Sequence, residues 1–281
     1  MRRLWIAIFA MAWGLLACTG NKQAKVVEQE PADTLQAETT DSAQTDEQDE
    51  LISDEPMPLA ADELFDDFIF NFAANKKLQQ ERILFPLAED IYGRLDSMKS
   101  RQWQMEHFFM RQGYYTLLFN SASELSVVKD TSLNEAIVEK IFLDEDYVKQ
   151  YHFQRIRGRW MLCKIREQHL SQNANASFLS FYKHFVADSV FQVKSLASQI
   201  EFVGPDPDDD FSQMEGVILP EYWDVFAPEL PDGLLYNIVY GQEKPEADEK
   251  VFVLRGIANG LELEMTFSRK SGQWKLTKLI T

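Results

Sequence analysis

The chain has 281 residues, of which 45% are hydrophobic, and its formal net charge is −17. This length and apolar content supply enough material for two cores of ordinary domain size. No basic patch stands against the acidic excess, which argues against nucleic acid and anionic lipid surfaces as partners. Much of the excess lies in residues 19–60, where eleven acidic side chains accompany only Lys22 and Lys25.

The first 18 residues have the pattern of a targeting signal. Two arginines precede an apolar stretch over residues 4–16, which is too short to span a bilayer as a permanent helix. The following Leu15-Leu16-Ala17-Cys18 resembles the lipobox of bacterial lipoproteins, which implies cleavage before Cys18 and lipid attachment to its sulfur. An ordinary secretory peptide with a chance cysteine is the alternative. Because Thr19 follows the cysteine, the resemblance implies a lipid-anchored protein of the cell envelope, at the outer membrane.

Residues 19–60 have the composition of a flexible tether. They contain no aromatic residue and are rich in Gln, Glu, Asp, Thr and Ala. Such a segment cannot bury enough apolar surface to offset the entropy of ordering it. With Cys18 assigned to lipid, Cys163 has no partner for an intramolecular disulfide, and we interpret it as a small buried side chain.

Two aromatic stripes predict two similar helices. Phe65, Phe68 and Phe72 are spaced to lie on one face of a helix, and Phe178, Phe181 and Phe185 repeat that spacing 113 residues later. An aromatic stripe of this kind is typical of a helix that packs on a core.

A second repeated pattern predicts two β-hairpins. Residues 153–165 and 267–279 both read Phe-x-Arg-x-x-Gly-x-Trp-x-Leu-x-Lys-(Ile/Leu), 114 residues apart. Apolar and polar residues alternate around a glycine turn, which favours a hairpin with one buried face. A further pair of anchors lies between helix and hairpin, because a tryptophan precedes a glycine by ten residues at Trp103 and again at Trp223. These repeats predict two copies of one domain, over residues 61–170 and 171–281.

Each copy reads as helices followed by antiparallel strands, which indicates an α+β fold. This order resembles the cone-shaped fold of nuclear transport factor 2. With the lipobox and the acidic tether, the chain resembles Bacteroidetes lipoproteins of domain-of-unknown-function family 4348. The resemblance covers residues 61–281 and implies two tandem cone-like domains, each with N-terminal helices packed on a curved antiparallel sheet. It also implies a pseudo-dimer within one chain, packed sheet against sheet, and therefore a monomer.

The sequence contains no familiar motif for nucleophilic, phosphate-binding or zinc chemistry. Asp206, Asp208 and Asp210 alternate like the first ligands of a calcium loop, but Phe211 and Val217 stand where that loop needs glycine and glutamate. We therefore expect a solvated acidic loop, no metal site and no cofactor.

Four residues are candidates for ligand binding: Lys164, Lys278, Tyr182 and His184. Strand alternation places Lys164 on the face of Trp160, and Lys278 on the corresponding face of the second hairpin. These lysines would either meet an anionic group in a concave pocket or extend their ammonium groups to water at the sheet edge. Tyr182 and His184, with Asp188, would suit an isomerase or dehydratase in the second copy.

The leading interpretation is a non-enzymatic envelope lipoprotein that binds an unidentified small molecule or envelope protein. One alternative is an enzyme of lyase or isomerase type with a pocket in the second copy. The other is a structural spacer or assembly component with filled cones. The volume and polarity of any pocket discriminate among the three.

Overall fold

The computed structural model describes residues 57–206 and 209–281, which belong to one compact unit spanning residues 46–281. The predicted signal peptide, the lipid attachment at Cys18 and the tether as far as residue 56 lie outside the described residues. In the described ranges, no helix combines the length and hydrophobicity needed to cross a lipid bilayer. We refer to the described residues up to 170 as the first half and to those from 171 as the second half.

Strands hold more of the described chain than helices do, and the helices are short. The helical elements are η2 (Leu59–Asp62), α1 (Phe65–Ala74), α2 (Lys76–Glu81), η3 (Ser100–Gln102), η4 (Phe108–Arg111), η5 (Ala122–Lys129), η6 (Leu170–Gln172), α3 (Ala176–Ala187), α4 (Ser189–Lys194), η7 (Pro220–Tyr222) and α5 (Trp223–Phe226). The strands are β1 (Ile83–Ile91), β2 (Arg94–Met98), β3 (Tyr114–Phe119), β4 (Glu135–Phe142), β5 (Tyr147–Ile156), β6 (Arg159–His169), β7 (Leu196–Asp206), β8 (Asp209–Ile218), β9 (Leu234–Tyr240), β10 (Glu249–Gly256), β11 (Glu262–Lys270) and β12 (Gln273–Ile280).

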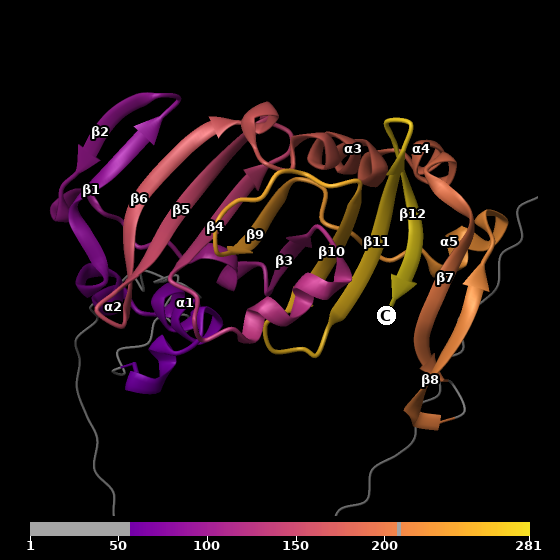
Figure 1. Cartoon of the computed structure of the whole chain (residues 1–281), viewed down its shortest axis with the longest axis horizontal. Coiled ribbons are helices and arrows are strands. Elements are labelled where there is room, and N and C mark those ends of the chain that lie inside the picture. The colour runs from indigo at the N-terminus through magenta and orange to yellow at the C-terminus, as the bar shows by residue number, and fades with distance from the viewer. Residues whose placement is uncertain (1–56, 207–208) are drawn as a thin grey trace, which may run out of the picture. The chain divides into compact units, whose positions relative to one another are not determined.

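All of these strands belong to a single sheet with the order β2-β1-β6-β5-β4-β9-β3-β10-β11-β12-β7-β8 (Figure 1). Neighbouring strands are antiparallel except at three junctions, where β1 pairs with β6, β12 with β7 and β3 with β9. In both halves a hairpin (β1–β2 or β7–β8) leads to a three-strand meander (β4–β5–β6 or β10–β11–β12), whose last strand returns to the hairpin.

The third strand of each half pairs with the fourth strand of the other half. β9 lies beside β4 through seven residue pairs, and β3 lies beside β10 through six. The two halves are therefore joined edge to edge through exchanged strands. The expectation that they pack sheet against sheet is wrong, because β3 and β9 pair with strands of the other half and the two halves share one sheet.

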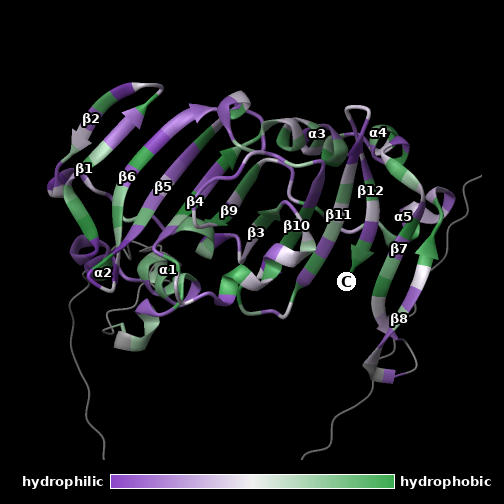
Figure 2. Ribbon diagram, in the orientation of Figure 1, coloured by the Kyte–Doolittle hydropathy of each residue, from purple (hydrophilic) through white to green (hydrophobic). Residues whose placement is uncertain are grey.

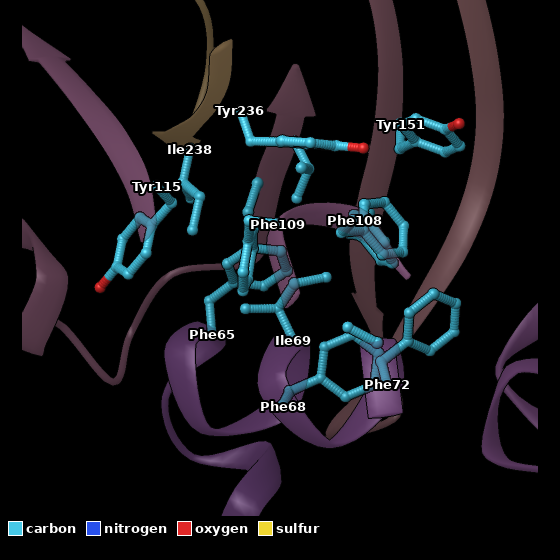
Figure 3. Close-up of a cluster of buried hydrophobic side chains, with 14 of the residues drawn as sticks. Phe65, Phe68, Ile69, Phe72, Phe108, Phe109, Tyr115, Tyr151, Tyr236 and Ile238 are labelled. Carbon is cyan, nitrogen blue, oxygen red and sulfur yellow. The ribbon is translucent and has the colours of Figure 1, made fainter. Parts of the chain in front are cut away.

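The sheet carries one hydrophobic core on each face. α1 packs Phe65, Phe68 and Phe72 into the first core (Figure 3). The ring centroid of Phe65 lies 5.0 Å from that of Trp160. In the second core Phe178 of α3 takes the corresponding place, 5.4 Å from Trp274. The two predicted aromatic stripes are thus confirmed as core-facing, with Phe181 the one member that is only partly buried.

The central strands contribute to both cores. Along β9, Tyr236 and Ile238 enter the first core, whereas the intervening Leu235 enters the second. Along β10, Val251 and Phe252 divide in the same way. This explains why the central strands read as continuous apolar runs, while hydrophobic and hydrophilic residues alternate along outer strands such as β11 (Figure 2).

Both predicted hairpins form, and each turns through two residues with positive φ. These are Arg157-Gly158 between β5 and β6 and Ser271-Gly272 between β11 and β12. Positive φ at both central residues is the geometry of the type I′ turn, which matches the right-handed twist of the flanking strands.

A bulge in each hairpin changes which residues share a face. In β6, Lys164 lies opposite His152 and Leu162 lies opposite Phe153, so Cys163 is an extra residue. Thr277 is the extra residue in β12. After the bulge, Ile165 and Leu279 occupy the buried positions. The prediction that Lys164 and Lys278 share the face of the tryptophans is therefore wrong, because a bulge interrupts the alternation of side chains.

Candidate ligand-binding cavities

Two cavities occupy corresponding positions in the two halves. The first, of about 360 Å³, lies between residues 105–112, Lys140 of β4 and the start of β9. The second, of about 710 Å³, lies between residues 228–232, Leu254 of β10 and Tyr114 at the start of β3. The repeat spacings of 120 and 114 residues relate these lining segments to one another. Because β3 and β9 are exchanged, each cavity takes part of its wall from the other half.

The first cavity, which we name the polar cavity, is lined by charged and aromatic side chains. The carboxylate of Glu106 accepts a hydrogen bond from Tyr151 Oη at 2.9 Å and lies 3.5 Å from Lys140 Nζ. Lys140 also lies over the ring of Tyr236, 5.4 Å from its centroid. Burial, and next the charge of Glu106, raise the pKa of Tyr151 well above its ordinary value.

His107 adds an unusual group to this cavity. Its Nδ1 is buried and has no hydrogen-bond partner among the described residues. Burial, followed by the charge of Arg111, lowers the pKa of His107. The imidazole is therefore neutral near pH 7.

A buried glutamine positions the segment that carries Glu106. The side chain of Gln79 on α2 donates from Nε2 to the backbone oxygen of Glu106 at 2.8 Å, and its Oε1 accepts from Trp103 Nε1 at 2.9 Å. In the second half Trp223 Nε1 donates to Gln192 Oε1 at the same distance. The repeated tryptophans of the sequence therefore fix the start of each cavity-lining segment to the helix α2 or α4.

The second cavity, which we name the apolar cavity, has an aliphatic floor and an acidic rim. Leu254 and Leu263 are only 4% and 3% exposed, and the half-buried Tyr114 and Leu230 form the wall. The rim carries the carboxylates Glu229, Asp232 and Glu262, all of them exposed.

Two tyrosines interact with the loop of residues 228–232, Tyr182 of the second half through a hydrogen bond and Tyr114 of the first half through the charge of Asp232. Tyr182 Oη donates to the backbone oxygen of Pro231 at 3.0 Å, which fixes the loop over the cavity. Burial raises the pKa of Tyr114, and the charge of Asp232 adds to the shift. Tyr182, a predicted ligand-binding residue, thus shapes the cavity through the loop.

A small polar pocket of about 50 Å³, lined by Glu139 and Lys250, lies toward the ends of β3 and β9, whereas the two cavities lie at the starts of these strands. The Glu139 carboxylate accepts from the side-chain amides of Asn173 at 2.6 Å, Asn237 at 2.7 Å and Gln150 at 3.0 Å, and burial raises its pKa. The Lys250 ammonium donates to side-chain oxygens of both halves, and burial lowers its pKa to about 8. A space of this size admits only a few water molecules. We interpret these groups as a structural hydrogen-bond network that connects β4, β9 and β10 to neighbouring segments.

The other predicted site residues lie apart from these cavities. Lys164 forms an ion pair with Asp90 of β1, with Nζ and Oδ2 3.0 Å apart. Lys278 is half-buried on β12. His184 Nδ1 lies 2.8 Å from the backbone oxygen of Ser180, and its ring lines a separate cavity of about 400 Å³ beside Trp274. Ligand binding by these three residues stays a prediction.

Asp188 caps the following helix and does not meet Tyr182 or His184 in a shared site. Its carboxylate accepts from the backbone N–H groups of Val190 and Phe191 at the start of α4. The three residues that would suit an enzyme in the second half are thus engaged in separate structural contacts.

Sequence reasoning missed the residues that line both cavities. The useful signal was the pair of tryptophans, because the cavity-lining segments 105–112 and 228–232 lie between each tryptophan and the strand that follows it. The sequence also shows that one cavity lining is charged and the other apolar, since Arg111 corresponds to Pro231 and Lys140 to Leu254.

Comparison with known proteins agrees with this architecture. A family model for a domain of unknown function, DUF4348, matches residues 44–281. Among solved structures, the chain is similar to an NTF2-like protein from Bacteroides fragilis NCTC 9343, with a TM-score of 0.73 and 41% sequence identity over 80% of this chain and 98% of that protein. No curated protein matches the chain. The structural likeness confirms the predicted α+β, cone-like fold.

Proposed function

The chain belongs to the DUF4348 family, and we propose that it is a non-enzymatic binding module that holds a small apolar ligand in its second half. The apolar cavity is the observation that carries this proposal. Its volume of about 710 Å³ falls within the range of roughly 300–1,000 Å³ in which proteins enclose small molecules. An aliphatic floor with polar groups at the mouth is also the usual composition of such sites.

The proposal places this module in the bacterial cell envelope, as a monomer anchored through lipid on Cys18 at the outer membrane. The charged, apolar and small-residue segments of positions 1–18 support the anchor, and the composition of residues 19–60 supports a tether. Incorporation of radiolabelled palmitate into the wild-type chain, and its loss in Cys18→Ala, would test the anchor.

The proposal also treats residues 61–170 and 171–281 as two copies of one unit. The recurrence of hairpin, meander and hydrogen-bonded tryptophan in both halves supports it. After duplication, the two cavities would have been free to diverge into a polar and an apolar version.

The two alternatives have less support from the structure. A spacer with filled cones needs no cavity of about 710 Å³. An enzyme in the second half needs a convergent set of polar groups, whereas Tyr182, His184 and Asp188 make separate contacts.

Mass spectrometry of small molecules that co-purify with the chain tests the proposed function. The experiment compares the wild type with Leu230→Trp, which fills the apolar cavity from its wall, and with Leu95→Trp at an exposed position of β2. We expect one apolar compound with the wild type and with Leu95→Trp, and its depletion in Leu230→Trp. Equal recovery from all three proteins, or no compound from any, would contradict the proposal.

A further inference from the structure

The mouth of the apolar cavity carries charge of one sign. Among the described residues that line it, Glu229, Asp232 and Glu262 are acidic and none is basic. Glu262 also pairs with Arg255, with Oε1 and Nη2 3.0 Å apart, so part of its charge is neutralised. Glu229 and Asp232 therefore dominate the electrostatic potential at the mouth.

The corresponding cavity in the first half does not carry this one-signed charge, so the acidic mouth is particular to the apolar cavity. The polar cavity has Arg111 and Lys140 in its lining, together with the single acid Glu106. At the corresponding positions the apolar cavity has Pro231 and Leu254. The second half thus lacks the two cations that would attract an anionic group, and has acids at its rim instead.

From this arrangement we infer that the apolar cavity selects amphipathic cations, that is, ligands with an aliphatic body and a basic amine or guanidinium head group. The body fits against Leu254 and Leu263, where it is removed from water. The head group stays at the mouth, where the rim carboxylates are exposed and the ammonium keeps most of its hydration. The inference rests on the proposed function and names the ligand class for the same site.

The expected selectivity is moderate, because exposed ion pairs are weak and are screened by salt. Two rim carboxylates acting together attract a cation and repel an anion, so the two effects add in a comparison of the two head groups. We expect a difference of about tenfold in Kd at low salt and about twofold at ~0.5 M salt.

Three probes of equal chain length test the inference: octylamine, octanoate and octanol. At pH 7 the first is cationic and the second anionic, and the third is neutral. Isothermal titration calorimetry on the chain from Thr19 onward gives the Kd of each probe. We expect octylamine to bind tightest, octanol next and octanoate weakest, with one site per chain.

Two rim variants and one matched control separate the rim from the overall charge of the protein. Asp232→Asn combined with Glu229→Gln should bring the Kd values of octylamine and octanoate within about twofold of each other while leaving that of octanol unchanged. Leu261→Lys places a cation at a rim position that is 41% exposed, and should reduce the preference for octylamine. Leu95→Lys adds the same charge at a position of β2 that is 78% exposed, and should leave the preference as it is.

The outcomes separate this inference from the proposed function. Tight binding of octanol without discrimination between the charged probes would overturn the inference and leave the binding function standing. The inference would also be overturned, with the binding function still standing, if Leu95→Lys changed the preference for octylamine as much as Leu261→Lys. Absence of binding by all three probes would overturn both.

Discussion

Glu139 shows how a single side chain connects distant parts of the chain. Its carboxylate lies in β4 and accepts hydrogen bonds from Gln150 in β5, from Asn237 in the exchanged strand β9 and from Asn173 just before α3. Burial raises its pKa, because the charged form is costly away from water. The surrounding amides offset part of this cost, so the residue is an acceptor whose loss would leave several buried donors unpaired.

Replacing Glu139 with glutamine should destabilise the protein. In the wild type each neighbouring amide donates to a carboxylate oxygen of Glu139. In the variant one of these donors faces the N–H₂ group of glutamine and is left unpaired, and an unpaired buried polar group costs about 1–3 kcal/mol. We expect the free energy of unfolding in urea to fall by about 2 kcal/mol. Glu135→Gln, at the start of the same strand, is the matched control and should change it by less than about 0.5 kcal/mol. Equal effects of the two substitutions would contradict the role given to Glu139.

His152 on β5 gives the protein a dependence on acid. Burial, and then the charges of Lys164 and Arg166, lower its pKa to about 4 from an ordinary value of 6.5. The unfolded chain therefore binds a proton between these two pH values that the folded chain does not bind. Stability is complete above about pH 6.5 and falls as the pH is lowered toward 4, by at most about 3 kcal/mol for this residue.

Replacing His152 with glutamine should remove this part of the pH dependence. We expect the difference in unfolding free energy between pH 7 and pH 4.5 to be smaller in His152→Gln than in the wild type by about 2 kcal/mol. His184→Gln removes an exposed imidazole and serves as the control. Chemical denaturation at the two pH values measures the difference, and parallel pH profiles for wild type and His152→Gln would refute the assignment.

At the scale of secondary structure, the two Gly-Trp hairpins form as their alternating pattern predicts. In each, an arginine of the first strand lies over the tryptophan of the second. The Cζ atom of Arg155 is 4.8 Å from the ring centroid of Trp160, and that of Arg269 is 4.9 Å from the ring centroid of Trp274. The repeated pattern therefore encodes a stacked pair as well as a turn.

The features that the sequence did not reveal are those without a local signal. Cys163 and Thr277 form bulges, but neither residue type marks a bulge, so alternation was extrapolated through them. Each copy reads as helices followed by antiparallel strands, and this reading did not place the hairpins β1–β2 and β7–β8 directly after α2 and α4. Ile83 and Leu87, for example, follow a helical stripe at spacings that suit either structure.

Glycine at the hairpin turns should be needed for its backbone conformation alone. Gly158 has a φ of +79°, and a Cβ atom added there would meet no other atom within 4 Å. Gly158→Ala should therefore lower the free energy of unfolding by about 1 kcal/mol through backbone strain. Gly216 in β8 also has open space, but its φ is not in the left-handed region. Gly216→Ala should be neutral or slightly stabilising. Thermal unfolding of both variants measures the two effects, and a similar loss of stability at both sites would contradict the explanation.

For the whole molecule, the decisive feature is the exchange of β3 and β9. Both strands read as continuous apolar runs, and nothing in either run specifies which fourth strand it pairs with. Sequence periodicity could therefore predict two similar units but not their connection. The same exchange brings Tyr114 and Leu234 into the cavities of the opposite halves. The cavity walls could therefore not be predicted from the sequence of either half taken alone.

The exchange predicts how the two halves behave when the chain is divided between Leu170 and Ser171. The first half alone lacks β9, which pairs with β4, and the second half alone lacks β3, which pairs with β10. Each half still carries its own third strand, which a second copy of the same half could use. We expect each half to form a homodimer by reciprocal exchange, and the two halves together to form a one-to-one complex, because β3 and β9 pair with β10 and β4 in the intact chain.

Size-exclusion chromatography with light scattering measures these masses. Leu117→Pro removes a ladder donor from the middle of β3 and should abolish the association of the first half. Leu95→Pro, on the edge strand β2, should leave the mass of the assembly unchanged, because an edge strand tolerates proline on its free side. A folded monomer from either half would contradict the exchange, since such a monomer would have to complete its sheet with its own third strand.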